Sequence, residues 1–295
     1  MFSRALECVE RFTCPVVMSQ RTINDHVTSM CASCIVVNRQ GWILTAAHVL
    51  KQIALLDEHR PEVEKYMKER DAILAISNLA EKVKRKRVGH LNKKQEWVTH
   101  QGVMWMGSPS AQIRMYHANW AADIAIGKLE TFDESAIKEY PVFKNPASPM
   151  LRGTSLCRLG FPFYEINASF DPTTGLFALA PNTFPIPLFP NEGIHTRIVI
   201  LKDPTHPEND PVKFIETSSP GLKGQSGGPI FDAHGNVWAM QSNTQTWPLG
   251  FSGTRTDPDG RKIVEHQFMN VGWGAHVEEI VKLFRQFSVE FKLSD

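Results

Sequence analysis

Short apolar runs separated by turn-forming residues dominate the chain. In the first half such runs lie at 16–18, 31–37 and 42–45, and the sequence NRQG between the last two favours a tight turn. We therefore expect a β-hairpin over 31–45. Further strands are predicted at 103–106, 113–116, 123–126, 155–159, 176–180, 194–201, 212–217, 236–242 and 263–271, with an extended loop at 181–193.

Helical spacing of apolar residues interrupts this pattern at three places. A short amphipathic segment is expected over 1–14, and a terminal helix over 275–287. Residues 52–88 predict one long amphipathic helix or two shorter ones, with Pro61 in a first turn, where proline is tolerated. The apolar positions of this insertion are Val63, Met67, Ile73, Ile76, Ala80 and Val83.

The order of the elements predicts two β-rich halves. Between them lies a polar, proline-rich segment, which is the best candidate for a linker. The predicted units are a lead-in at 1–14, a first half at 15–130 with the insertion at about 52–88, a linker at 131–150, a second half at 151–274 and a terminal helix at 275–295.

The composition predicts a soluble globular protein in a reducing compartment. The 295 residues are 42% hydrophobic and 21% charged, and the net charge of +1 gives no general attraction to nucleic acid or membranes. The first twenty residues are too charged for a secretory signal, and no apolar run reaches the roughly 18 residues of a membrane span. Five cysteines, an odd number, indicate free thiols. We expect a cytoplasmic protein with no membrane partner.

Two short motifs could indicate a metal site or a phosphate-binding site. Cys31-x-x-Cys34 would be half of a zinc site, but no second CxxC or HxxxH follows, so we expect no metal and no cofactor. Residues 82–87 carry five positive charges and could bind phosphates. A solvated helix end explains them better, because cations suit that end of the helix dipole. No aromatic residues interleave to form a nucleic-acid groove.

The candidate chemistry centres on the sequence GQSGGP at 224–229. Each glycine costs backbone entropy on folding, and close approach of the backbone to a ligand is the usual reason for accepting that cost. If Ser226 is a nucleophile, the N–H groups of Gly224 and Ser226 would converge where an oxyanion develops. Taken alone, the stretch is equally compatible with an ordinary turn between strands.

Two further motifs precede this stretch, TAAH ending at His48 and DIAI beginning at Asp123. With Ser226 they give the order His, Asp, Ser, and here the sequence resembles the trypsin/chymotrypsin clan of serine proteases. It is most similar to the bacterial trypsin-like branch that includes the HtrA proteases. The resemblance covers about 15–50 and 97–287. It implies a mainly β fold of two six-stranded antiparallel β-barrels, with the helical insertion in the first barrel.

The resemblance also implies a catalytic triad that hydrolyses peptide bonds. His48 would take the proton of the Ser226 hydroxyl and give it to the leaving amine, and Asp123 would fix the imidazole tautomer. The N–H groups of Gly224 and Ser226 would form the oxyanion hole, where loss of one donor costs roughly 3–4 kcal/mol. The implied substrate is a protein or peptide.

Two departures from the family pattern bear on activation. Gln225 stands where the secreted digestive proteases have an aspartate that pairs with a newly cut N-terminus, so we predict no activation by such a cut. Val49 replaces a cysteine that usually follows the histidine, which agrees with a cytoplasmic enzyme. No PDZ module is recognised after the protease region, so a degradative HtrA-type chaperone-protease is not expected.

The resemblance places the floor of the primary specificity pocket at Pro220. No carboxylate stands there, and Glu216 is the nearest acid, so a pocket for an uncharged, apolar or small side chain is predicted. Lys223 at the rim could favour an acidic neighbour in the substrate, although a solvated lysine also explains it. The remaining substrate-binding positions are Met240, Gln241 and Ser242, which would also pair with substrate backbone as an added strand, and Gly272, Trp273 and Gly274.

Three hypotheses follow. The first is an active endopeptidase whose insertion at 52–88 docks a partner or a dedicated substrate. The second is a protease that stays latent until a partner binds. The third is a binding protein with a protease fold that acts through its basic helix, against which the intact set of His48, Asp123 and Ser226 argues.

Overall fold

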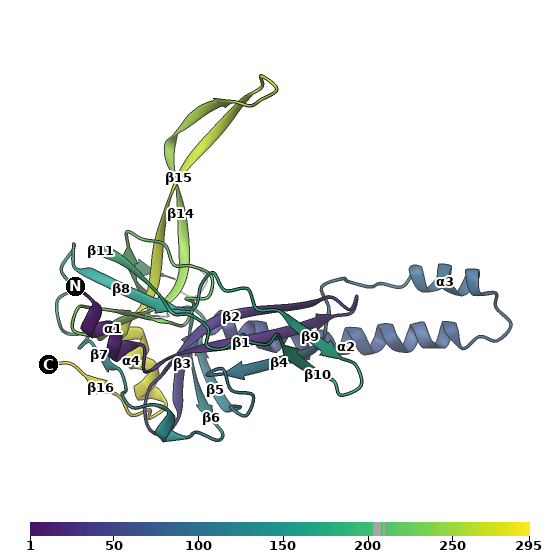
Figure 1. Cartoon of the computed structure of the whole chain (residues 1–295), viewed down its shortest axis with the longest axis horizontal. Coiled ribbons are helices and arrows are strands. Elements are labelled where there is room, and N and C mark those ends of the chain that lie inside the picture. Colours follow the sequence, from purple (N-terminus) through teal and green to yellow (C-terminus); the bar gives the residue numbers. More distant parts are fainter. Residues whose placement is uncertain (203–207, 209) are drawn as a thin grey trace.

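The computed structural model describes residues 1–202, 208 and 210–295, and its body consists of two curled β-sheets (Figure 1). The first sheet has the strand order β4-β1-β2-β3-β6-β5. The predicted hairpin is confirmed, because Ile35 pairs with Leu44 and Val36 with Ile43. The strands are β1 (Thr13–Thr22), β2 (Val27–Val36), β3 (Trp42–Ala46), β4 (Val98–Trp105), β5 (Ile113–Asn119) and β6 (Ile124–Leu129).

The second sheet contains a closed ring of six strands. Its order is β13-β8-β11-β12-β15-β14, and β13 also pairs with β14. The predicted mainly β, chymotrypsin-like architecture is confirmed. Two short strands extend the sheet by parallel pairing, β7 on β14 and β16 on β7. The strands are β7 (Val142–Phe143), β8 (Ser155–Gly160), β11 (Phe189–Leu201), β12 (Val212–Thr217), β13 (Pro229–Phe231), β14 (Asn236–Thr256), β15 (Lys262–His276) and β16 (Lys292–Leu293).

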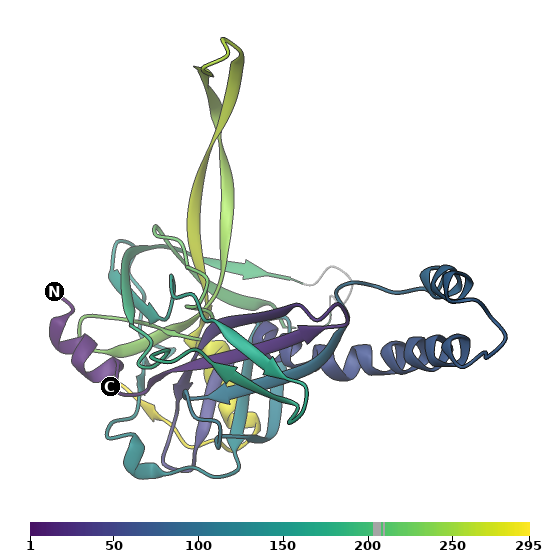
Figure 2. The same cartoon turned by 45° about the vertical axis from the view of Figure 1, so that its right-hand side comes forward.

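Several elements differ from the expected strand pattern. A separate hairpin forms from β9 (Ala168–Asp171), which was not predicted, and β10 (Leu176–Leu179). β11 begins at Phe189, inside the predicted loop. β14 and β15 extend far beyond their predicted ranges and project from the body as a long two-stranded ribbon (Figures 1 and 2). The proposed linker holds the 3-10 helix η1 (Glu134–Ala136) and β7, and its Ile137 and Phe143 are buried.

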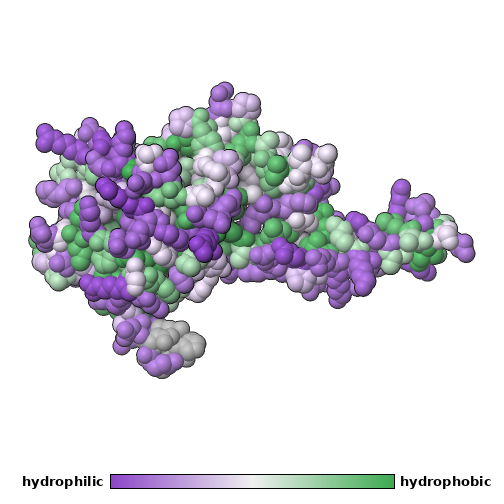
Figure 3. Space-filling view, turned by 90° about the horizontal axis from the view of Figure 1, so that it is seen from below, coloured by the Kyte–Doolittle hydropathy of each residue, from purple (hydrophilic) through white to green (hydrophobic). Residues whose placement is uncertain are grey.

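The helical insertion is longer than predicted and starts earlier. α2 (Ala47–Leu74) begins directly after β3, and α3 (Glu81–Gly89) follows it. Pro61 lies inside α2 instead of in a first turn, which corrects the sequence prediction. The predicted apolar face is not covered either: Ile76 and Val83 are exposed. The pair projects from the body, and Figure 3 shows hydrophobic residues scattered over its largely hydrophilic surface.

The body anchors α2 from its base as far as Tyr66. The side-chain amides of Gln20 and Gln101 both donate to the Gln52 carbonyl, at 3.0 and 2.9 Å. Further along, the ring of Tyr66 packs edge-on against Trp97, with 6.3 Å between the centroids. Edge-to-face aromatic contacts of this kind add to the apolar burial. The body therefore holds α2 from its start to about Tyr66, and the rest of the helix projects.

The remaining helices cover the sheets. α1 (Ser3–Val9) forms within the predicted lead-in and buries Ala5 and Val9. α4 (Val277–Gln286) lies within the predicted terminal helix and buries Ile280 and Phe284 in the core. Among the described residues, no helix is long and apolar enough to cross a membrane.

Candidate active site

The structure brings His48 and Asp123 into direct contact. His48 is the second residue of α2, and Asp123 lies immediately before β6, with a left-handed φ of 53°. β3 and β6 are paired neighbours, and Ala46 lies opposite Ile124, which places both residues at the same edge of the sheet. The His48 ring nitrogen Nδ1 lies 2.9 Å from Asp123 Oδ2, and the His48 backbone N–H donates to Asp123 Oδ1 at 2.9 Å.

The second barrel supplies the remaining polar groups. Ser242 on β14 donates its hydroxyl to Asp123 Oδ2 at 2.5 Å, so the aspartate is held from both barrels. The carbonyl of the same residue accepts from the Ser226 hydroxyl at 3.4 Å. Ser242 therefore contacts both Asp123 and Ser226, and this links Ser226 to the His48–Asp123 pair at the junction of the two barrels.

Hydrogen bonds to Asp123 determine its protonation. Burial raises the pKa of this carboxyl, but the bonds from His48 and Ser242 more than offset that effect and lower the pKa below its usual value. Asp123 is therefore ionised at neutral pH. An ionised carboxylate beside Nδ1 keeps the proton on that nitrogen and leaves Nε2 free to accept one.

The nucleophile loop needs its glycines because it is packed against the first barrel. Gly227 has φ of 89°, and a Cβ there would lie 2.0 Å from the Ser33 carbonyl oxygen. Gly224 has φ of 98°, and its Cβ would lie 2.3 Å from the carbonyl oxygen of Phe161. Positive φ and this close approach together exclude any other residue type. The loop is therefore not an ordinary strand-to-strand turn.

Ser33 on β2 ties this loop to the first barrel. Its N–H donates to the Ser226 carbonyl at 2.8 Å, and its hydroxyl donates to the Gly224 carbonyl at 2.7 Å. With both carbonyls turned toward Ser33, the N–H groups of Gly224 and Ser226 have no hydrogen-bond acceptor within the described residues. Free, oriented N–H groups are what an oxyanion hole requires.

Gln225 is completely buried and braces the loop from within. Its Oε1 accepts from the Leu222 N–H at 3.0 Å, and its Nε2 donates to the Phe189 carbonyl at 3.2 Å. Both ends of the amide are therefore used inside the chain. Sequence reasoning identified this position as unusual, but it did not supply these partners.

The predicted specificity pocket is largely filled by the chain itself. The Thr244 hydroxyl donates to the Gly221 carbonyl at 2.6 Å, and the buried Gln241 amide lies where a Cβ on Gly221 would stand. On the other side, the Arg158 guanidinium occupies the space beside Gly272. These side chains take up space beside Gly221 and Gly272, two positions at the predicted pocket.

Arg158 was missed by sequence reasoning, since nothing in its strand marks it as part of a site. It is only 2% exposed, and its Nη1 donates to the Pro220 carbonyl at 2.8 Å. It also bonds the backbone and hydroxyl oxygens of Ser219, both at 2.8 Å. Burial lowers the pKa of this guanidinium to about 10. Arg158 thus holds the backbone at Pro220, the predicted floor of the pocket, through hydrogen bonds.

Other predicted pocket residues lie elsewhere. Met240 belongs to the hydrophobic core, and Gly274 packs against Ile230, so neither faces a substrate pocket. Lys223 is exposed. Glu216 is buried but engaged, because Arg197 and Trp273 both donate to its carboxylate, at 2.9 and 3.1 Å.

A hollow of about 480 Å³ opens beside the catalytic candidates. Its apolar walls include Trp120 and Phe214, and its polar lining includes His48, Asp123 and Asn243 of β14. Trp120 is 58% exposed, although it precedes Asp123 by only three positions. Such a concave, partly apolar surface next to polar groups suits an extended peptide.

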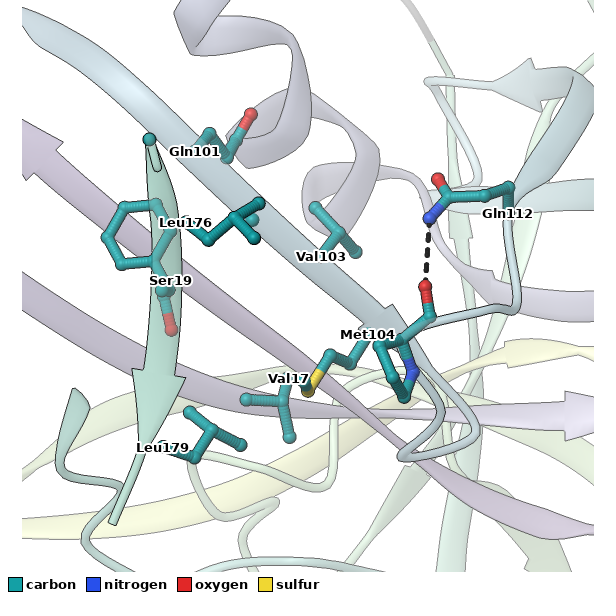
Figure 4. A pocket seen from close by; sticks show the side chains of 12 residues that line it. Val17, Ser19, Gln101, Val103, Met104, Gln112, Leu176 and Leu179 are labelled. Carbon is teal, nitrogen blue, oxygen red and sulfur yellow. Dashed lines mark hydrogen bonds between the residues drawn. The ribbon is translucent and has the colours of Figure 1, made fainter. Parts of the chain in front are cut away.

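A second hollow, of about 350 Å³, is shown in Figure 4. It lies between β1, β4 and the β9–β10 hairpin, and its walls include Val17, Met104 and Leu179. The Gln112 side chain donates to the Pro109 carbonyl at 3.2 Å across its edge. None of the predicted catalytic residues lines it.

The cysteines carry no reactive signature. Burial raises the pKa of Cys14 and Cys31 to about 12, and that of Cys157 to about 11. Within the part of the chain that the structure describes, no group of three or more His, Cys, Asp or Glu side chains is placed to hold a metal ion.

Three comparisons with known proteins show what the chain is similar to. Among solved structures, the Rv3671c protease of M. tuberculosis in its active form matches with a TM-score of 0.48 and 14% identity over 98% of this chain and 86% of its own. A point variant of the HtrA-type protease AlgW with a decapeptide matches with a TM-score of 0.51 and 10% identity, over 97% and 66%.

At these identities the structural likeness concerns the fold alone. A search of curated proteins found no relative. The family model of the trypsin-like peptidase domain matches residues 32–240, well over half of the chain. The protein therefore belongs to the trypsin-like peptidase family.

Proposed function

We propose that this protein is a cytoplasmic serine endopeptidase that cleaves peptide bonds through an acyl-enzyme on Ser226. The observation that carries the proposal is the position of Asp123. Its carboxylate accepts from His48 of the first barrel and from Ser242 of the second, and Ser242 also contacts the Ser226 hydroxyl. A protein that used this fold only as a scaffold would have no physical need for this arrangement.

The chemistry follows from these contacts. His48 Nε2 takes the proton from Ser226 while the oxygen attacks the scissile carbonyl, and the N–H groups of Gly224 and Ser226 stabilise the oxyanion. His48 then gives the proton to the leaving amine, which departs and leaves the acyl-enzyme. A water molecule, deprotonated by the same imidazole, hydrolyses the ester. Asp123 stays ionised throughout and stabilises the imidazolium.

Substrate binding would also free the nucleophile. The Ser226 hydroxyl donates to the Ser242 carbonyl at 3.4 Å, which is a long and weak contact. A substrate strand added to β14 would offer its own N–H to that carbonyl. The hydroxyl proton would then turn toward His48. A peptide substrate is further supported by the HtrA-type protease AlgW, whose structures contain a decapeptide or a tripeptide.

Labelling with a fluorophosphonate probe tests the enzyme proposal. We expect the wild-type protein to be labelled and Ser226→Ala to remain unlabelled, because the probe reacts only with an activated serine in an assembled site. Labelling that appears only after a partner is added would identify a latent enzyme. An unlabelled wild-type protein under every condition would refute the proposal.

We further propose that the residue before the scissile bond is small and uncharged. Thr244 closes the mouth of the pocket through its bond to Gly221, and Gln241 fills the space behind it. In cleavage of a peptide library, we expect alanine-sized residues to dominate at that position. Thr244→Gly should extend the preference to larger apolar residues, with a gain of about tenfold or more per bulky residue admitted. A wild-type preference for Arg or Lys would contradict this reading.

The insertion is the proposed docking element for a partner or a dedicated substrate. α2 begins at the residue before His48 and ends in the projecting part of the molecule, where Ile76 and Val83 remain exposed. An occupant there would act on the same helix that carries the general base.

A further inference from the structure

β14 and β15 continue beyond the second barrel as a two-stranded arm (residues 243–270), the green and yellow ribbon in the upper part of Figures 1 and 2. All residues of the arm are exposed except the half-buried Gln245, Asp257 and Gln267. An isolated two-stranded ribbon is marginally stable in water, and its free edges are templates for another chain. The exposed large apolar side chains on it are Trp247, Leu249, Phe251, Ile263, Val264, Phe268 and Met269.

The base of the arm is part of the active site. Asn243, Gln245 and Trp273 line the same hollow as His48 and Asp123. A peptide that occupies this hollow therefore touches β14 within the arm, and β15 at Trp273, just below the arm.

The face that begins in the hollow continues outward with apolar side chains. Successive residues of a strand point to opposite faces, and paired residues share a face. Trp247, which pairs with Met269, therefore lies on the same face as Asn243 and Gln245. Phe268 lies on the opposite face, one pair further out.

β14 also has a free edge along this stretch. Up to Met240 it is paired on both sides, with β13 and with β15. From Asn243 outward, β15 is its partner and no second strand is paired with it within the described residues. A substrate strand that continues the antiparallel order of the sheet runs toward Ser242. Its residues over the arm therefore precede the scissile bond.

The charges of the arm favour no charged occupant. The outer part of the arm carries three positively and three negatively charged residues, so its net charge is zero. Arg255 forms an ion pair with Glu265 at 2.7 Å. The six charged residues are Arg255, Arg261 and Lys262, and Asp257, Asp259 and Glu265. The arm would therefore recognise a bound polypeptide through apolar contacts.

We propose that the arm is an extended substrate-binding surface, whose Trp247–Met269 face holds an apolar, extended stretch of polypeptide on the N-terminal side of the scissile bond. The proposal rests on the endopeptidase function proposed above and names its substrate class: unfolded or extended apolar segments. Pro248 lacks an N–H, so a substrate strand added along β14 would find no backbone donor there, and side-chain contact would hold it beyond that point.

The test compares two fluorogenic peptides that share the residues around the cleaved bond. One is short, and the other is extended on its N-terminal side by apolar residues. For wild-type protein we expect a higher kcat/KM for the long peptide. In Trp247→Ser the ratio of the two kcat/KM values should fall about tenfold, as expected for the loss of one large apolar contact.

Phe268→Ser is the matched control, because it removes an equally exposed aromatic ring from the opposite face one pair away. We expect its long-to-short ratio to equal that of the wild type. Equal long-to-short ratios in all three proteins would overturn the proposal. It would also be overturned if Trp247→Ser left the ratio unchanged but converted a dimer of the wild type into a monomer in size-exclusion chromatography, because the face would then bind a second copy of the chain. If the wild-type protein and both variants all failed to cleave the short peptide, the endopeptidase function itself would be refuted instead.

Discussion

Single buried side chains set the working shape of this molecule. Gln225 uses both ends of its amide, on the Leu222 N–H and the Phe189 carbonyl, so its loop is held without an ion pair to a chain terminus. Arg158 is also buried and donates to the Pro220 carbonyl, although its Nε has no partner within the described residues. Buried polar groups of this kind are costly unless every donor and acceptor is paired. Their partners are therefore as important to the site as the reacting groups.

A buried histidine makes the fold sensitive to acid. His276 caps α4 by accepting from the Glu278 N–H at 3.0 Å, and burial lowers its pKa to about 4. In the unfolded chain the histidine binds a proton near pH 6.5. The unfolded state therefore gains protons first, and the stabilisation is complete above pH 6.5 and lost as the pH falls toward 4.

We expect His276→Asn to weaken this dependence, since asparagine keeps a capping oxygen that does not titrate. Between pH 7 and pH 4.5, the free energy of unfolding should fall by roughly 1–3 kcal/mol less in the variant than in the wild type. Urea titrations at several pH values measure this difference. His234→Asn, at an exposed position, is the control. Equal pH slopes in wild type and His276→Asn would contradict the prediction.

At the scale of the elements, the basic segment at 82–87 contributes to the contact between α2 and α3. Lys84, in the middle of the basic segment, is buried and donates to the Leu74 carbonyl at 2.9 Å, near the end of α2. Cations are favoured at that end of a helix, where carbonyls lack partners. One of the five charges therefore joins the two helices, and the others remain exposed.

Replacing this lysine tests the interpretation. Lys84→Met should loosen the connection between α2 and α3 by about 1 kcal/mol, and we expect faster proteolytic cutting in the intervening residues 75–80. Lys86→Met, at an exposed position two residues on, should be cut at the wild-type rate. Equal rates of cutting in Lys84→Met and Lys86→Met would contradict this interpretation.

The sequence pattern predicted the elements that alternate apolar and polar residues, and it failed where backbone pairing alone makes a strand. β12 matches its predicted range, 212–217. The outer half of β14 contains Pro248, Gly250 and Gly253, and these turn-forming residues are typical of a loop. The start of β11 includes Pro190 and was read the same way. In both, inter-strand hydrogen bonds supply an order that side-chain periodicity does not reveal.

The candidate site shows the same division. His48, Asp123 and Ser226 were found because their roles demand particular residue types in a particular chain order. Ser33 and Arg158 could not be found, since a serine and an arginine on ordinary strands become informative only once distant segments are placed together. Long-range contacts carry this information, and no local pattern encodes it.

At the scale of the whole molecule, the two barrels form one site. Ser33 of the first barrel holds the nucleophile loop of the second, and Ser242 of the second barrel holds Asp123 of the first. Docking of the barrels and assembly of the site are therefore a single event.

Ser33→Ala tests this coupling. Loss of its hydroxyl bond to the Gly224 carbonyl should lower the free energy of unfolding by about 1 kcal/mol. Fluorophosphonate labelling should slow about tenfold, because the oxyanion hole loses part of its support. Ser29→Ala is the control on the same strand, since the Ser29 hydroxyl bonds only Ser19 within the described residues, away from the loop. Unchanged labelling in Ser33→Ala would show that the loop holds its shape alone.

The position of β15 in the chain determines when the site can exist during synthesis. β15 is the strand that pairs with β14 beside the Ser242 segment, and it ends at His276, which follows all three candidate catalytic residues in the chain. A nascent chain that already displays His48, Asp123 and Ser226 therefore still lacks the strand that completes the second barrel. The ribosome must therefore synthesise the chain through His276 before the second barrel can close around the site, so the order of the strands along the chain itself delays assembly of the site.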